Sequence, residues 1–514
     1  MSTDQTFNFG RIRTLLWPIH RVELKKFLPM FLIFFLICIN YSLLRAAKDA
    51  LVITAHQAGA EVIPFIKVWA ILPMALLFTL LFTRLSNKHS REKVFYIMIS
   101  IFIGFFALFA FVLYPCRDII HPHGVCDQLQ AGLPAGFKGL IGIFRNWSFT
   151  LFYVMSELWG TTIMTILFWG FANDVTSVKN AKRFYAILIM GANIASIVSG
   201  YISILLSKGA LYQLFPGGSD PWGKCILFLT CVISVVGVAI IGLFYRLNRN
   251  VIDHEEAVDS VASNKKKKIK MGMRSNFAYL AKSKYLICIA VIVLAYNLSI
   301  NMIEVIWKDQ VKLLFPVPND YNAYMGKVMM MMGALSSFVS IFLCGNVIRR
   351  FGWTVSAMIT PITLFISAML FFSFLLFRET GLGGIAVMMG TTPLALGVLF
   401  GAIQNSLART CKYTLFDTTK EIAFIPLSPE CKLKGKAAID GVGSRLGKSG
   451  GSIIHQSLLM IFGTVSMSTP YVAGLLLLVI GAWTIATRSL GHQFKELTQE
   501  EAPAQNESLQ EAMG

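Results

Sequence analysis

Charged residues are scarce in this chain of 514 residues, where Asp, Glu, Lys and Arg together make up 14%, whereas soluble domains carry about 25%. Acidic residues are rarest, with 27 Asp and Glu against 46 Lys and Arg, which leaves a formal net charge of +19. Hydrophobic residues make up 55% of the chain, and the mean hydropathy is +0.64. This composition excludes an ordinary soluble domain and predicts a membrane protein.

Patterns for metal binding and redox chemistry are also lacking. The eight His and nine Cys residues form no HxxxH or CxxC pair with ligand spacing, so neither a metal nor another cofactor is expected. Cys116 and Cys126 share one predicted external connection and could form a disulfide, or both could remain free thiols. No cleavable signal peptide is expected, because residues 1–26 are polar and the next apolar run is too long for a signal peptide.

Two motifs that resemble catalytic loops occur near residue 447. Residues 447–451 (GKSGG) satisfy GxSxG, but that nucleophile elbow requires a strand-to-helix turn, and the flanks here are an apolar helix. The same residues resemble the end of a Walker A loop, yet its first glycine would fall at Val442. No His or carboxylate pair accompanies a nucleophile, so a membrane-embedded hydrolase or transferase is not expected.

The sequence instead contains a series of apolar runs, each long enough to cross roughly 30 Å of hydrocarbon as a helix. Twelve are predicted, and the fifth and eleventh are interrupted by Gly, Ser and charged residues. The runs cover residues 27–45, 62–83, 94–114, 149–170, 184–206, 223–245, 285–307, 325–348, 354–377, 382–407, 437–463 and 468–488.

Lys and Arg crowd alternate connections between these runs, as the positive-inside rule requires of cytoplasmic loops. Examples are residues 11–26, 84–93, 246–284 and 409–436. Both termini and the central loop are therefore predicted to be cytoplasmic, and this distribution explains the positive net charge without nucleic acid as a partner. The run Lys265 to Lys268 could touch anionic lipid headgroups, or it could act only as a solvated topology signal.

The basic central loop divides the chain into two weakly similar halves, in which Lys48-Asp49 of the first run has a counterpart in Lys308-Asp309 of the seventh. Two six-helix halves with a site between them at the midplane are the major-facilitator arrangement. The predicted fold is an all-α polytopic membrane protein of this kind. We expect an N-terminal cytoplasmic segment (1–26), a six-helix bundle (27–245), a basic linker (246–284), a second six-helix bundle (285–490) and a disordered tail (491–514).

Ionisable side chains lie inside these runs or at their mouths, although one charge at the bilayer centre costs roughly 2.5 to 3.5 kcal/mol on insertion scales. Such groups normally face a partner or a water-filled pathway, and most of them here are cations, so an anionic cargo is expected. They are Arg45, Lys48, Glu157, Glu304, Lys308, Asp440, Arg445 and Lys448.

Helical spacing of three, four and seven residues gathers these side chains into polar stripes, one on each of three runs. The stripes comprise Tyr41, Arg45 and Lys48 on the first run, Asn297, Asn301, Glu304 and Lys308 on the seventh, and Lys436, Asp440, Ser444 and Lys448 on the eleventh.

Each charged group has a structural alternative. Lys48 and Lys308 lie near the ends of their runs and could extend to the headgroups. Glu157 and Glu304 could be structural partners of nearby cations. Lys448 lies well inside its run, so contact with a ligand or a gating ion pair is expected there.

Four segments of the chain stand out together: 44–49 (LRAAKD), 156–160 (SELWG), 301–308 (NMIEVIWK) and 435–440 (GKAAID) with 447–451 (GKSGG). They resemble the ATP/ADP translocases of obligate intracellular bacteria, in particular chlamydiae, and of plant plastids, and the resemblance extends from about Trp17 to Arg488. It implies an antiporter, not an enzyme, that exchanges external ATP for internal ADP, with or without phosphate, across a bacterial inner membrane. The alternative is a proton-coupled or broad-specificity importer of nucleotides or other organic anions.

The resemblance also implies which charges transport requires. They fall on Lys48, Glu157, Glu304 and a lysine late in the chain, which is Lys448 or alternatively Lys436.

The chemistry of a nucleotide agrees with this assignment, because a triphosphate must exchange its hydration for cations, and Arg forms bidentate contacts with phosphate. Candidate phosphate ligands are Arg45, Lys48, Arg445 and Lys448, and Lys308 is a further candidate for substrate binding. The two glutamates would hold the lysines in place while the site is empty, or close a gate.

For adenine, an aromatic stack or an Asn contact is expected, and the candidates are Asn301, Tyr153 and Phe168. The expected partners are thus ATP, ADP and the lipid bilayer, in a monomer.

Overall fold

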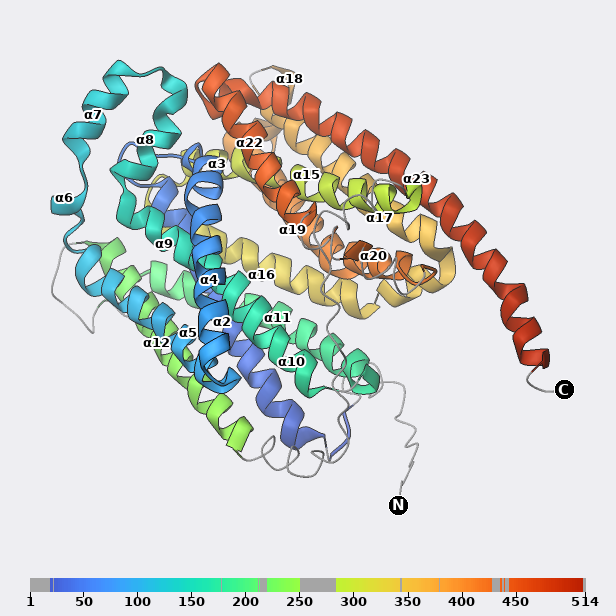
Figure 1. Ribbon diagram of the computed structural model, residues 1–514. Helices are drawn as coiled ribbons and strands as arrows, with labels where there is room; N and C mark the ends of the chain where they lie inside the picture. Colours follow the sequence, from blue (N-terminus) through green and yellow to red (C-terminus); the bar gives the residue numbers. More distant parts are fainter. Residues whose placement is uncertain are drawn as a thin grey trace.

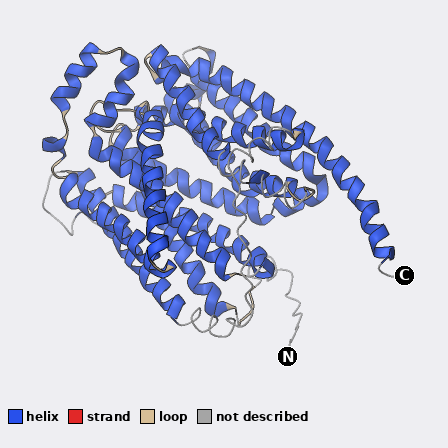
Figure 2. Ribbon diagram, in the orientation of Figure 1, coloured by secondary structure: helices blue, strands red, loops and turns tan. Residues whose placement is uncertain are grey.

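The computed structural model describes residues 19–511 except 22, 177, 211, 213–219, 250–282, 343, 379, 428–434, 437–438 and 440–442. In this part the chain is helical and contains no strand (Figure 2). The all-α prediction is therefore confirmed. The expected N-terminal segment and the basic linker lie mostly outside the described residues.

The first half contains long helices and three π-helical segments within them. Its elements are α2 (Leu24–Ile53), α3 (Val62–Phe65), η1 (Ile66–Ile71), α4 (Leu72–Lys88), α5 (Arg91–Leu108), η2 (Phe109–Leu113), α6 (Arg117–Ile120), α7 (His123–Gly132), η3 (Ala135–Phe137), α8 (Lys138–Arg145), α9 (Trp147–Leu158), η4 (Trp159–Phe168), α10 (Trp169–Val175), α11 (Val178–Ser207) and α12 (Pro221–Leu247).

The second half follows the same plan with one π-helical segment. Its elements are α15 (Lys284–Leu314), α16 (Pro318–Phe342), α17 (Cys344–Leu376), α18 (Gly381–Met388), α19 (Pro393–Cys411), η7 (Lys412–Phe416), α20 (Asp417–Ala423), α22 (Ser444–Phe462) and α23 (Val465–Glu511).

Ten helical segments of the described chain are long and apolar enough to cross a membrane, against twelve predicted runs. The two others correspond to α19 and α22, which are 19 residues each and contain many polar residues. The chain is thus a multi-pass membrane protein, and the count of twelve is approximate.

Two boundaries differ from the sequence prediction. The helix α22 begins at Ser444, seven residues after the predicted start of the eleventh run, and Asp440 lies outside the described residues. The segment expected to be a disordered tail from residue 491 continues α23 as helix to Glu511. The low hydrophobicity of the tail predicts disorder, but its Glu, Gln, Ala and Leu residues have a high intrinsic preference for helix.

The two halves pack against each other chiefly through α11 and α16, with α2 also contacting α16 (Figure 1). Glycines allow the backbones to approach closely here: a Cβ atom on Gly200 would lie 2.5 Å from the carbonyl oxygen of Gly326, and a Cβ on Gly326 would lie 2.7 Å from that of Gly200. Small residues at such crossings are typical of helix packing in membranes.

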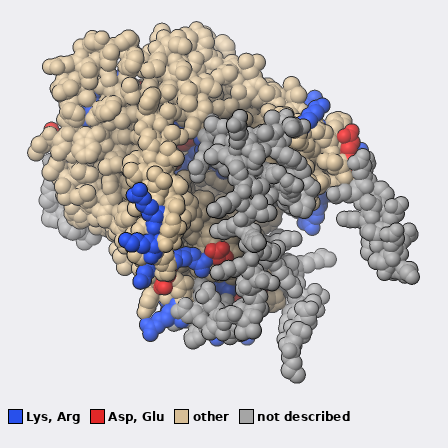
Figure 3. Space-filling view, in the orientation of Figure 1, with Lys and Arg blue, Asp and Glu red and all other residues tan. Residues whose placement is uncertain are grey.

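The molecule has two distinct faces. We call the face that carries α6, α7 and α8 the α7 face, and the opposite face, where α2 begins and α4 ends, the basic face (Figure 1). In Figure 3, Lys and Arg side chains gather toward the basic face, whereas the visible surface near the α7 face is almost uncharged. The halves meet at the α7 face, where a Cβ on Gly136 of η3 would lie 2.5 Å from the Cα of Met460 in α22.

Candidate functional site

Lys48 of α2 is the first member of a chain of buried ion pairs. Its ammonium group lies 2.9 Å from Oε1 of Glu157 in α9 and 3.1 Å from Oδ1 of the adjacent Asp49. It also lies 3.7 Å from the centroid of the Tyr153 ring, a cation–π contact. The side chain of Lys48 is only 4% exposed, so it does not extend to the headgroups.

Lys308 of α15 continues the chain into the second half. Its ammonium lies 2.8 Å from Oδ2 of Asp49, a contact between the halves, and 3.0 Å from Oε1 of Glu304, one helical turn earlier. Arg409 of α19 contacts the same Glu304 oxygen at 3.0 Å. The Lys308 side chain is 2% exposed, which rules out the alternative that it extends to the membrane surface.

Lys67 of η1 adds a second connection between the halves. It donates a hydrogen bond of 2.6 Å to Oδ1 of Asn301 and lies 4.0 Å from Oε2 of Glu304. The other amide group of Asn301 is engaged too, because Nδ2 donates to the carbonyl of Asn297 at 2.8 Å. Asn301, a candidate for adenine contact, therefore has both amide atoms occupied in this state.

Local helix geometry aims these side chains inward. The π-helical segment η4 begins two residues after Glu157, η7 begins three residues after Arg409, and η1 includes Lys67. A π-helical turn inserts an extra residue and rotates the following side chains, and such turns are frequent at functional sites. Three of the four π-helical segments in the described chain thus flank the ion-pair chain.

The charges in this cluster do not cancel. It holds four cations against three acids, and buried charges of this kind require paired geometry because desolvation is costly. The members are Lys48, Lys67, Lys308 and Arg409 with Asp49, Glu157 and Glu304.

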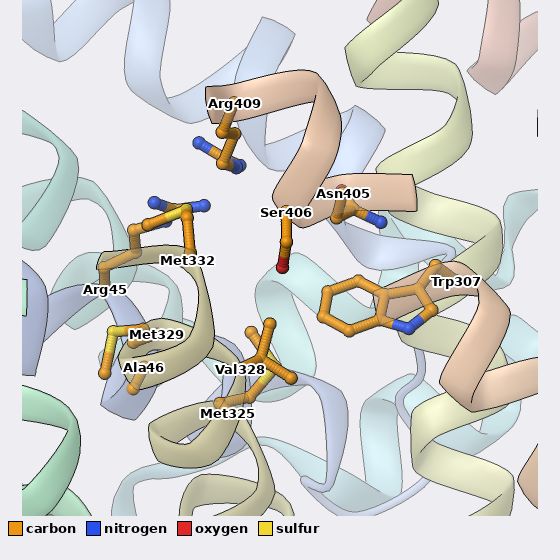
Figure 4. Close-up of a pocket in the computed structure, with 10 residues that line it drawn as sticks. All are labelled: Arg45, Ala46, Trp307, Met325, Val328, Met329, Met332, Asn405, Ser406 and Arg409. Carbon is orange, nitrogen blue, oxygen red and sulfur yellow. The ribbon is translucent and has the colours of Figure 1, made fainter. Parts of the chain in front are cut away.

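Arg45 adds a further positive charge one turn before Lys48. Its guanidinium points toward Arg409 of the other half, and both line one pocket (Figure 4). Among the described residues Arg45 forms no ion pair. Two guanidinium groups that approach from opposite halves repel each other unless an anion lies between them, so the geometry suits a bound anion.

The late lysines occupy different surroundings. Lys448 is exposed, forms no ion pair with the described residues, and interacts electrostatically with Lys412 and Glu157, which places it beside the central cluster. Lys436 pairs with Glu421. The side chain of Arg445 and all of Asp440 lie outside the described residues. Of the two late lysines, Lys448 is thus the one near the site.

The remaining aromatic candidates lie in three different surroundings. Phe168 is fully buried and stacks on Phe34 with ring centroids 4.5 Å apart, inside the core of the first half. The Tyr153 ring is covered by Lys48. Tyr41 packs against Gly160, where an added Cβ would lie 2.7 Å from its ring.

Sequence reasoning missed Asp49, Lys67 and Arg409 as members of the site. Lys67 did carry a signal, because it is a cation within the predicted second run. Arg409 follows the tenth run and was counted among the basic loop residues. Asp49 is adjacent to Lys48, but its contact with Lys308 depends on how two helices 260 positions apart pack.

The α7 face carries a polar network outside the spanning helices. The His121 ring shares a 2.7 Å hydrogen bond with the Ser148 hydroxyl, and burial lowers the pKa of His121 to about 4. Arg145 pairs with Asp127 at 2.6 Å. Cys116 and Cys126 are free thiols, so the disulfide considered from the sequence is not formed in this structure.

Two solved structures share the fold over most of the chain. One is a bacterial homologue of the iron transporter ferroportin in an inward-facing state, with 14% identity and a TM-score of 0.53 over 92% of this chain and 99% of that one. The other is a D-xylose-proton symporter, with 11% identity and a TM-score of 0.52 over 91% and 96%. They confirm the major-facilitator-like arrangement.

Sequence relatives are much closer. ADP,ATP carrier protein 1 of Chlamydia trachomatis serovar D is 46% identical over 487 residues, which cover 95% of this chain and 92% of the relative. A chloroplastic ADP,ATP carrier protein 1 of Arabidopsis thaliana is 43% identical over 93% of this chain and 75% of its own length. Residues 2–494 match the family described as TLC ATP/ADP transporter. The chain therefore belongs to the TLC ATP/ADP transporter family, whose members are carriers and not enzymes.

Proposed function

We propose that this protein exchanges external ATP for internal ADP across a bacterial inner membrane by alternating access between its two halves. The observation that carries the proposal is the ion-pair chain from Glu157 to Arg409, which joins both halves and leaves a positive excess for a polyanion. Both halves of the site come from one chain, which supports a monomer as the working unit.

The basic face is the cytoplasmic face in this proposal, because basic residues gather there as the positive-inside rule requires (Figure 3). The structure then represents a state closed to the outside, in which η3 packs against α22. The exposed Lys448 beside the cluster supports access from the cytoplasm in this state.

The acids hold the cations of the site in place while it is empty. Glu157 holds Lys48, and Glu304 holds both Lys308 and Arg409, so these cations stay in place without substrate. The phosphates of a nucleotide, with about four negative charges in ATP, compete with the carboxylates for the cations through charge-assisted bonds.

Competition of this kind explains an obligate exchange. The contacts between the halves, Lys308 with Asp49 and Lys67 with Asn301, depend on cations that phosphate would recruit. A bound nucleotide therefore weakens the contacts that hold the two halves together. After the halves have moved and this nucleotide has left, the next nucleotide neutralises the cations of the site again. An empty carrier keeps its ion pairs and stays closed, because opening would leave buried charges unpaired.

Vesicle transport tests this proposal directly. Purified protein in liposomes preloaded with ADP is expected to take up labelled ATP quickly, and empty liposomes are expected to take up almost none. A pH gradient across empty vesicles should not restore uptake. If it does, the exchanger proposal fails, and the proton-coupled alternative with Glu157 or Glu304 as the titrating group replaces it. Labelled phosphate loaded beside ADP shows in the same assay whether phosphate is carried too.

A further inference from the structure

A pocket lies between the halves and shares Arg409 with the ion-pair chain (Figure 4). Its walls come from α2 of the first half and from α15, α16 and α19 of the second. Arg45 and Arg409 lie at one end, whereas Trp307, Val328 and Met325 line the other. The pocket is thus charged at one end and apolar at the other.

Ser406 of α19 provides a polar group that lacks a partner. Ser406 is 1% exposed, and its hydroxyl forms no hydrogen bond with the residues that the structure describes. In Figure 4 this oxygen points into the pocket. Buried hydroxyl groups are nearly always paired, with protein or with water, so the Ser406 hydroxyl is a polar group that is available to pair with a ligand in this pocket.

Asn405 offers a second polar group with a fixed orientation. Its Nδ2 donates to the carbonyl of Gly401 at 2.9 Å. Because a carbonyl can only accept, the amide nitrogen must face it, and Oδ1 is left without a hydrogen bond among the described residues. A carboxamide with a free oxygen and a second N–H can pair with both the amino group and a ring nitrogen of adenine.

We propose that this pocket receives the adenine base of the transported nucleotide, with Asn405 and Ser406 as its specificity-determining residues. The assignment rests on the proposed function, and it places the phosphates beyond Arg45 and Arg409, next to the cations of the ion-pair chain. An inorganic phosphate does not suit the apolar end, because Val328 and Met325 offer it no donor. Adenine suits this pocket, because it is a flat base with apolar faces and polar edges.

Binding measurements on the purified full-length protein separate the base from the phosphates. The three probes are ATP, ITP, which carries oxygen in place of the adenine amino group, and tripolyphosphate, which has no base. In Asn405→Ala, ATP affinity is expected to fall about tenfold, the loss of one good base contact, while ITP and tripolyphosphate change less than twofold. Leu399→Ala is the matched control, because Leu399 lies on the same helix and is 47% exposed.

Ser406→Ala distinguishes a role of the unpaired hydroxyl in ligand binding from a role in the stability of the protein. Removal of a buried, unpaired hydroxyl should leave the melting temperature of the empty protein unchanged or raise it, while ATP affinity falls and tripolyphosphate affinity does not. The proposal is overturned if all three probes weaken together in both variants, or if none weakens. Wild-type protein that binds ATP but fails to exchange it for ADP would refute the transport proposal and leave this comparison intact.

Discussion

Asp49 of α2 and Lys308 of α15 form an ion pair of 2.8 Å across the boundary between the two halves, and their side chains are 0% and 2% exposed. The pair sits between two others, since Asp49 also contacts Lys48 and Lys308 also contacts Glu304. We call the pair of Asp49 and Lys308 the latch, because the two halves cannot separate here until both charges have found new partners.

Substitution of one member of the latch should be far more harmful than substitution of both. Asp49→Asn or Lys308→Met alone leaves a buried charge short of a partner and is expected to cost about 3 to 5 kcal/mol of stability. The double variant should recover much of this loss. Melting temperatures of the four proteins form a double-mutant cycle that measures the coupling. The exposed pair Arg91 with Asp174 is the control, and Asp174→Asn should change stability by less than about 1 kcal/mol.

The lysines of the site and the acids that hold them should all be required for transport. Lys48→Ala, Lys67→Ala, Glu157→Ala, Glu304→Ala and Lys448→Ala are each expected to reduce labelled ATP uptake at least tenfold, since one lost contact exceeds about 1.4 kcal/mol. Uptake is measured in ADP-loaded vesicles with equal amounts of inserted protein.

The control for these five variants is Lys88→Ala, at the exposed end of α4, which should transport normally. Near-normal uptake by both the Lys48 and the Lys448 variants would contradict a phosphate site built from these lysines.

Closure of the α7 face should depend on Gly136. A side chain there would collide with the backbone of Met460, so Gly136→Val disfavours the observed state and should shift the carrier toward one that is open on this face. Gly132→Val is the control, because nothing lies within 4 Å of its added Cβ. Labelling of a cysteine introduced at Asn301 by a membrane-impermeant reagent from the α7 side reports the shift, and equal labelling in both variants would refute it.

The helices of the α7 face should loosen as the pH falls. The pKa of His121 is lowered from 6.5 to about 4 by burial, so the folded form prefers the neutral ring. Stability from this group is fully present above pH 6.5 and is lost between about pH 6.5 and 4. Hydrogen-exchange protection in α6 and α7, corrected for the intrinsic pH dependence of amide exchange, is expected to fall over this interval. His121→Gln, which cannot titrate, should reduce the change, and the lowered pKa of His123 accounts for a remainder.

The sequence by itself determined the class of the protein and the nature of its site. Apolar runs of membrane length are local properties, so they predict the membrane helices without reference to the rest of the chain. Helical spacing likewise placed Asn301, Glu304 and Lys308 on one face of α15. The cost of an intramembrane charge identified Lys48, Glu157 and Glu304 before any neighbour was known.

Tertiary structure alone decided which charges meet. Lys308 stands near the end of α15, where a lysine can reach the headgroups, but the packing of α15 near α2 buries it against Asp49. Arg409 lies in a stretch that the sequence predicts to be a basic loop, but in the structure it belongs to α19 and contacts Glu304. Ion pairs between helices depend on the register and rotation of both partners, which no single segment encodes, and so the connections of the site appear only when the two halves are packed together.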